Sequence, residues 1–224
     1  TIIVAAPNII IITHRSYSTM KYTRWHCAFT CICATLVSLL PCAYGKQIDV
    51  IDIDGPINPV TAEYLIKSID EAESGSAECL IVQMDTPGGL DLSMRSIIKK
   101  IFASRVPVIV YVAASGARAA SAGAIITLAA HIAAMAPSTN IGAAHPVSIG
   151  AGEMGKDMAE KVVNDAAAYV EGIAIKRNRN KEWAIKAVRE SVSLSEQEAL
   201  KNKVIDLIAP DLKTLISLID GRTV

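Results

Sequence analysis

The chain has 224 residues, of which 51% are apolar, and its 22 basic residues balance its 22 acidic residues to a formal net charge of zero. This length and composition fit one domain with a sizeable core and an appendage. The sequence has no basic cluster and no glycine-rich phosphate loop, which argues against a nucleic-acid partner and against nucleotide chemistry.

The N-terminal part of the chain has the pattern of a secretory signal peptide over residues 20–45. Two basic residues precede an apolar stretch, and Ala43 and Gly45 supply the small side chains of a cleavage site. We expect the signal to be cleaved rather than kept as an anchor, and the domain to be exported to the periplasm or the outer face of the membrane. Residues 1–19 are expected to be an upstream extension outside the fold, and residues 46–224 to form the domain.

Four of the five cysteines lie within this signal, so Cys79 alone would remain. Its apolar neighbours predict a buried, inert thiol. The cysteine spacings predict neither a disulfide framework nor a zinc site.

After the signal, strands and helices alternate at intervals of roughly 25–30 residues, which is typical of a parallel α/β fold. The first strand shows polar and apolar alternation, and the next two are continuous apolar runs. In chain order, strands are expected over 47–54, 79–84, 106–112 and 204–208. Helices are expected over 58–73, 90–102, from about 120, 157–176, 183–190 and 212–219, with a short capped helix after Ser193.

The apolar stretch from Ala119 to Ala136 is long enough to imitate a membrane span. It contains Ser121, Thr127 and His131, whose polar groups are costly in lipid. A helix buried inside the domain is the better interpretation. The following segment, 137–154, is rich in glycine and proline and is expected to form loop and short strands.

Two junctions between a strand and a helix can carry chemistry. At the first, Gly88 and Gly89 follow a buried strand, so their N–H groups can approach a ligand without an intervening Cβ. At the second, Ser121 stands between alanines where a buried strand turns into a helix, and the N–H of Ala122 can help to hold a developing negative charge. A simple turn and an ordinary helix serine remain the alternatives.

A serine nucleophile needs a base, and the sequence offers three candidates. His131 lies on the apolar stretch and suits a core role, whereas His145 ends a short predicted strand and can reach a site. Lys161 points away from the packed face of the long helix, and a lysine serves as base when it is neutral. Asp165, four residues later, can pair with Lys161 and would oppose that role.

Several ordered blocks of the sequence together resemble the protease domain of NfeD proteins, which are membrane-associated relatives of ClpP and signal peptide peptidase A. The resemblance covers nearly all of residues 46–224. The blocks are MDTPGG (84–89), GARAASAGAIITLAA (116–130), AMAPSTNIGAAHPV (134–147), KVVNDAAAYV (161–170) and RESVSLSEQEALKNKVIDLIA (189–209).

The resemblance implies an α/β fold, the ClpP/crotonase-like spiral of β-β-α units. It also implies a serine endopeptidase in which Ser121 is the nucleophile, Lys161 the base, and the N–H groups of Gly88, Gly89 and Ala122 bind the oxyanion. No metal or cofactor is implied. Family substrates are hydrophobic peptide segments, including those of stomatin-like membrane proteins, and relatives self-associate as dimers or larger assemblies.

Three other interpretations stay open at this point. The serine can pair with His145 instead, as ClpP pairs its serine with a histidine. Crotonase-type acyl-CoA chemistry shares the fold, but it commonly uses acidic residues, and neither glycine-rich junction contains a glutamate. The chain can also be an inactive envelope protein that binds a stomatin-like partner.

Overall fold

The computed structural model of the protein describes residues 47–147 and 155–224. The predicted extension (1–19) and signal (20–45) lie outside the described residues, as does the end of the predicted loop segment. Within the described ranges, no helix is both long and apolar enough to span a membrane.

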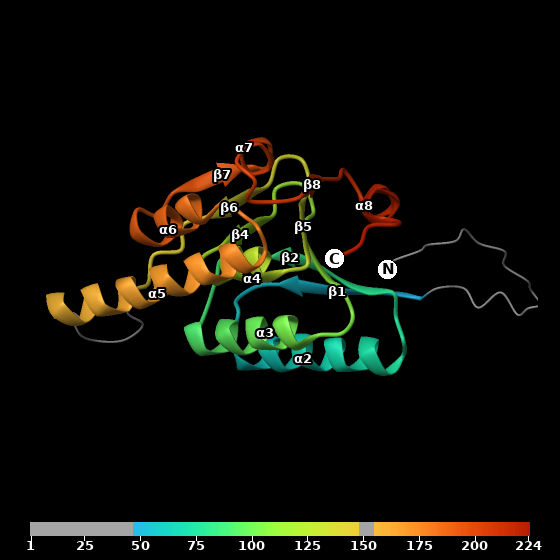
Figure 1. The fold of residues 1–224 in the computed structure, drawn as a ribbon, viewed down its shortest axis with the longest axis horizontal. Coiled ribbons are helices and arrows are strands. Elements are labelled where there is room, and N and C mark those ends of the chain that lie inside the picture. Colours follow the sequence, from blue (N-terminus) through green and yellow to red (C-terminus); the bar gives the residue numbers. More distant parts are fainter. Residues whose placement is uncertain (1–46, 148–154) are drawn as a thin grey trace, which may run out of the picture. The chain divides into compact units, whose positions relative to one another are not determined.

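The core of the domain is a five-stranded parallel sheet with the strand order β1-β2-β3-β5-β8 (Figure 1). Strands β2 and β3 are buried on both faces, which explains why the sequence gives them continuous apolar runs. The strands are β1 (Ile48–Asp54), β2 (Cys79–Asp85), β3 (Val108–Val112), β5 (Ile132–Met135) and β8 (Leu207–Ile208).

A smaller sheet of three short strands lies beside the main one, in the order β4-β6-β7. Its strands are β4 (Arg118–Ala120), β6 (Asn140–Gly142) and β7 (Ser193–Ser195). Parallel bridges from Ile57 to Gly89 and from Thr86 to Ala119 extend the same pattern to the earlier connections. The chain therefore repeats one unit, in which a core strand is followed by a short second-layer strand or bridge and then by a helix.

The helices are α2 (Pro59–Ser74), α3 (Asp91–Ala103), α4 (Ala122–Ala129), α5 (Lys156–Lys176), α6 (Lys181–Arg189), α7 (Glu196–Lys201) and α8 (Leu212–Ile219). Helices α2 and α3 lie side by side on one face of the main sheet (Figure 1). Leu80 and Val82 of β2 belong to the apolar core on that face. Ile81, on the opposite face, packs in a second core with Leu215 and Ile219 of α8.

The predicted elements agree with the structure over most of the domain, but the apolar stretch 119–136 is not one buried helix. It is divided into the end of β4, the eight-residue helix α4 and strand β5. Arg179 Nη1 donates to the carbonyl oxygens of Leu128 at 2.6 Å and of Ala130 at 2.9 Å, and Arg177 Nε donates to that of Ala129 at 2.7 Å. These side chains satisfy the carbonyls at which α4 ends, so the helix stops without leaving buried acceptors unpaired.

Candidate active site

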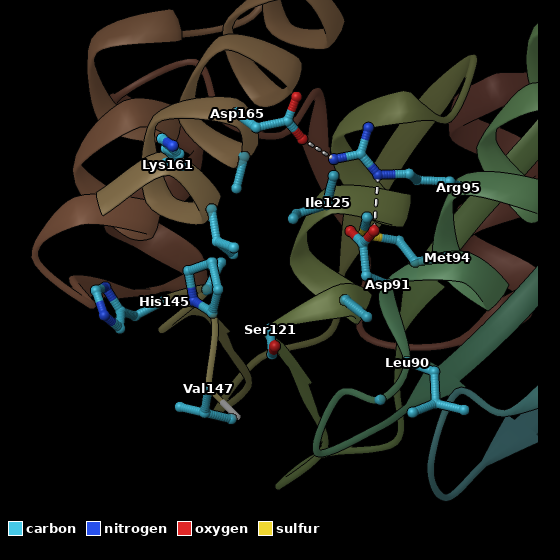
Figure 2. Close-up of a pocket in the computed structure, with 16 residues that line it drawn as sticks. Leu90, Asp91, Met94, Arg95, Ser121, Ile125, His145, Val147, Lys161 and Asp165 are labelled. Atoms are coloured by element: carbon cyan, nitrogen blue, oxygen red, sulfur yellow. Dashed lines mark hydrogen bonds and ion pairs between the residues drawn. The ribbon is translucent and has the colours of Figure 1, made fainter. Parts of the chain in front are cut away.

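The two glycine-rich junctions meet in one pocket of about 460 Å³. Helix α3 and the segment before it form one wall, the β4–α4 junction forms the floor, and the loop after β6 and helix α5 form the opposite wall (Figure 2). The predicted site residues Gly89, Ser121, Ala122 and Lys161 all line it, as does His145.

Ser121 lies at a sharp turn between β4 and α4, in a backbone conformation that is rare for a residue with a side chain. Its φ is 53° and its ψ is −116°, a strained region that proteins use mostly at functional sites. Its N–H donates to Gly142 O at 2.9 Å, and its carbonyl accepts from Ala124 N at 3.0 Å. Its hydroxyl does not cap α4 and has no hydrogen-bond partner among the described residues, so Ser121 Oγ is available to a ligand in the pocket.

Gly88 makes room for Ser121. A Cβ built on Gly88 would lie 2.5 Å from Ser121 Cβ, and the φ of Gly88 is +110°, so both space and backbone conformation require glycine. The N–H of Gly88 donates to Thr86 Oγ1 at 3.1 Å. The expected oxyanion donor at Gly88 is therefore already engaged within the loop, because the Thr86 hydroxyl turns back onto it.

Neither the N–H of Gly89 nor that of Ala122 donates a hydrogen bond to a described residue. Gly89 must also be glycine, because a Cβ there would lie 2.0 Å from Ile57 O. Ala122 is the first residue of α4, where N–H groups have no partner within the helix and the helix dipole favours negative charge. Two unpaired N–H donors that share a pocket with an available serine hydroxyl are the arrangement that an oxyanion hole requires.

Lys161 lies on α5, across the pocket from Ser121 (Figure 2). Its side chain is exposed, and among the described residues its amine makes no hydrogen bond or ion pair. Asp165 does not pair with it. The Asp165 carboxylate instead accepts from Arg95 Nη2 of α3 at 2.5 Å, so the ion pair that would oppose the base role of Lys161 is not formed.

The two histidines take different places. The Nδ1 atom of His145 lies 2.8 Å from Val188 O, which ties the loop after β6 to α6, and its ring is directed away from Ser121 (Figure 2). His131 is outside the pocket, where its Nδ1 accepts from Val108 N at 3.1 Å. Burial, together with the charges of Arg177 and Arg179, lowers the pKa of His131 to about 4.

Sequence reasoning missed Arg95 and Thr86. The four-residue spacing between Asp91 and Arg95 predicts a pair within α3, and Arg95 Nε does donate to Asp91 Oδ2 at 2.8 Å. The contact from Arg95 to Asp165 joins residues 70 positions apart, so no pattern in the neighbouring sequence predicts it. Among the described residues, no group of three or more His, Cys, Asp or Glu side chains is arranged to hold a metal ion.

Comparison with known proteins identifies the family. The sequence model of the family described as "NfeD1b, N-terminal domain" matches residues 47–215, which cover most of the chain. The chain belongs to this family. The domain is 38% identical over 174 residues to the "Membrane-bound protease PH1510" of Pyrococcus horikoshii, and 31% identical over 167 residues to the "Membrane protein NfeD1b" of Bacillus subtilis.

These two relatives are much longer than the NfeD1b domain. The alignments cover 77% and 75% of this chain but only 39% and 37% of the relatives, so the chain spans about two fifths of their length.

Solved structures agree with the family assignment and confirm the expected ClpP/crotonase-like fold. A serine-to-alanine variant of the "1510-N membrane-bound stomatin-specific protease" matches with a TM-score of 0.74 and 36% identity, covering 79% of this chain and 86% of that one. A lysine-to-alanine variant in complex with a substrate peptide matches with a TM-score of 0.72 and 34% identity, covering 80% and 86%. The 1510-N protease specific for a stomatin homolog from Pyrococcus horikoshii gives a TM-score of 0.68 at 34% identity, with the same coverage.

Proposed function

We propose that this NfeD1b domain is a serine endopeptidase with Ser121 as nucleophile and Lys161 as general base. The observation that carries the proposal is the strained turn at Ser121, which holds an available hydroxyl in one pocket with the N–H groups of Gly89 and Ala122. The relatives add support. The serine and the lysine that are substituted in the solved 1510-N variants are separated by nearly the same interval as Ser121 and Lys161.

Each step of the proposed reaction has a group in the pocket. Neutral Lys161 takes the proton of Ser121 Oγ as the oxygen attacks the peptide carbonyl, and the new oxyanion accepts hydrogen bonds from Gly89 and Ala122 N–H. Protonated Lys161 then gives its proton to the leaving amine, which breaks the C–N bond and leaves an acyl-enzyme. Water hydrolyses this ester with Lys161 again as base, which regenerates Ser121.

Lys161 and Ser121 lie on facing walls rather than in a direct hydrogen bond. Such contacts are often open in the free enzyme and close in the complex with substrate. A peptide lying between α3 and α5 excludes water from the Lys161 amine, and this loss of hydration favours the neutral form that a base requires.

The lining of the pocket supports a hydrophobic peptide as substrate. Besides the polar groups already described, it consists mostly of apolar side chains: Leu90, Met94, Ile125, Ala144, Val147, Val162 and Ala166. Leu90 and Val147 are 41% and 76% exposed at its rim, where they can pack on an apolar ligand. We infer that a hydrophobic segment of a stomatin-like membrane protein is the physiological substrate, because the 1510-N relatives are described as stomatin-specific. The signal pattern of residues 20–45 supports action on the outer side of the membrane.

The test is hydrolysis of a hydrophobic peptide by the purified chain, compared with its Ser121→Ala and Lys161→Ala variants. We expect both variants to fold and to lose turnover by at least about 10³-fold, because nucleophile and base act as a unit. His145→Ala is included in the same panel and should retain activity.

Two matched controls separate catalysis from general damage. Ser138→Ala removes another serine of positive φ, at 62°, outside the pocket, and Lys156→Ala removes a lysine from the first turn of the same helix. Both should cleave like the wild type. Full activity of Ser121→Ala would exclude the proposed nucleophile, whereas inactivity of His145→Ala with an active Lys161→Ala would assign the base to the histidine. If the wild type does not cleave and a serine-reactive phosphonate does not label Ser121, the peptidase proposal fails, and binding of a stomatin-like peptide without turnover is the function to measure next.

A further inference from the structure

An arginine bridge crosses the pocket from α3 to α5. The guanidinium of Arg95 donates through Nε to Asp91 Oδ2 at 2.8 Å and through Nη2 to Asp165 Oδ2 at 2.5 Å. Its carbon Cζ lies 4.2 Å from the ring centroid of Tyr169, which is on the same helix as Asp165. Figure 2 shows the guanidinium between the two carboxylates. Together with the ring of Tyr169, these carboxylates fix Arg95 in place, and its side chain is only 32% exposed.

We propose that Arg95 is a positioning residue that holds the Asp165 carboxylate away from the Lys161 amine. This inference rests on the proposed base role of Lys161. Residues four positions apart on a helix lie on the same side, within reach of one another. Without Arg95, the carboxylate of Asp165 is free to turn toward the amine of Lys161 and to stabilise its charged form.

Asp165 is the α5 carboxylate that shares the pocket with Lys161. The nearest acidic residues on α5 are Asp157 and Glu160, before Lys161, and Asp165, one turn after it. Of these three, Asp165 alone lines the pocket, whose other charged or titratable lining residues are Asp91 and Arg95 of α3 and His145 of the loop after β6. Arg95 holds both Asp91 and Asp165. Arg189 Nη2 donates to Asn164 Oδ1 at 2.7 Å and holds the residue beside Asp165. Arginines from two neighbouring helices therefore restrain the turn of α5 that follows Lys161.

The expected effect is modest because Asp165 is 70% exposed, and water screens its charge. A carboxylate four residues from a lysine favours the charged pair by about twofold at most. When Arg95 is removed, we therefore expect the titration midpoint of the Lys161 amine to move upward by up to about 0.4 pH unit. Below that midpoint, the neutral fraction and the rate that depends on it would fall by up to about twofold.

The direct experiment is NMR titration of isotope-labelled lysine in the full chain at low salt, from about pH 6 to pH 11. The Ser121→Ala background prevents self-cleavage, and Lys161→Arg assigns the signal. Arg95→Met removes the charge and keeps an apolar stem against Tyr169, and Arg95→Lys keeps a positive charge. Arg95→Met/Asp165→Asn removes the freed carboxylate. Arg95→Gln replaces Arg95→Met if the latter does not fold.

We expect the Lys161 midpoint to rise in Arg95→Met, to stay near the wild-type value in Arg95→Lys, and to return in the double variant. The same order should appear in the pH profile of kcat/KM for peptide cleavage with Ser121 restored. An unchanged midpoint in Arg95→Met, or an equal rise in the double variant, would overturn the inference and leave Arg95 as a structural link. Because the titration needs no turnover, it gives this answer even if the peptidase proposal fails.

Discussion

Gly88→Ala tests whether the close approach of the Gly88 backbone to Ser121 positions the nucleophile. The added Cβ would lie 2.5 Å from Ser121 Cβ and 3.1 Å from Ser121 Oγ, whereas ordinary contacts begin at 3.4 Å. Ser121 must therefore move by about 1 Å, a displacement that typically lowers an enzymatic rate by about 10²-fold. The positive φ of +110° adds about 1–2 kcal/mol of backbone strain for an alanine.

The assay measures kcat for a hydrophobic peptide together with the free energy of unfolding by denaturant. Gly55→Ala is the matched control, because Gly55 has a similar φ of +117° but no atom within 4 Å of an added Cβ. We expect both variants to lose stability through strain, and Gly88→Ala alone to lose about 10²-fold in kcat. Wild-type kcat in folded Gly88→Ala, or an equal loss of kcat in Gly55→Ala, would refute the steric argument.

Three further predictions concern the groups around helix α4. Gly123→Ala should destabilise the domain by about 1–3 kcal/mol in denaturant unfolding, because its Cβ would lie 2.3 Å from Thr86 Cγ2. The additional substitution Thr86→Ser deletes that methyl group and should restore much of the lost stability. Arg179→Met should lower the free energy of unfolding by about 3–5 kcal/mol, because it leaves Asp206 and the carbonyls at the end of α4 without their donor. A loss below about 1 kcal/mol would contradict this prediction. The fold lowers the pKa of His131 from 6.5 to about 4, so the unfolded chain takes up the proton at a higher pH than the folded chain does. The contribution of His131 to the free energy of unfolding is therefore complete above about pH 6.5, and it falls by up to about 3 kcal/mol as the pH drops to 4. His131→Asn should flatten this pH dependence in unfolding experiments.

The order of helices and strands could be predicted because most elements have a strong local signal. The start of α2 has Asn58 as cap, whose side chain accepts from Thr61 N, and the long α5 shows a clear apolar period that places Val170 and Ile173 in the core. Short elements stabilised by distant partners could not be predicted. Strand β7 has three residues and exists because it pairs antiparallel with β6.

The candidate site was only partly predictable. Sequence patterns made Ser121 and the glycine pair candidates, because small residues at the end of a buried strand let a ligand approach the backbone, and the family resemblance gave them their expected roles. They did not reveal that Thr86 occupies the N–H of Gly88, since a hydroxyl that turns back within a loop has no periodic pattern. Leu92 is apolar by residue type, yet it is 80% exposed, because the packed face of α3 is set by Met94, Ile97 and Ile101 and Leu92 lies on the opposite side of the helix.

Helix α4 is held in place by contacts at both of its ends. At its first turn, the strained backbone of Ser121 is held by Gly142 O and by contact with Gly88. At its last turn, the buried guanidinium of Arg179 fixes the terminal carbonyls to Asp206 Oδ2, which also accepts from Ala133 N of β5. A helix of eight residues has too few internal hydrogen bonds to be stable by itself. The position of the serine therefore depends on restraints at both ends of α4, and strain at Ser121 persists because the packing on either side leaves the backbone no alternative.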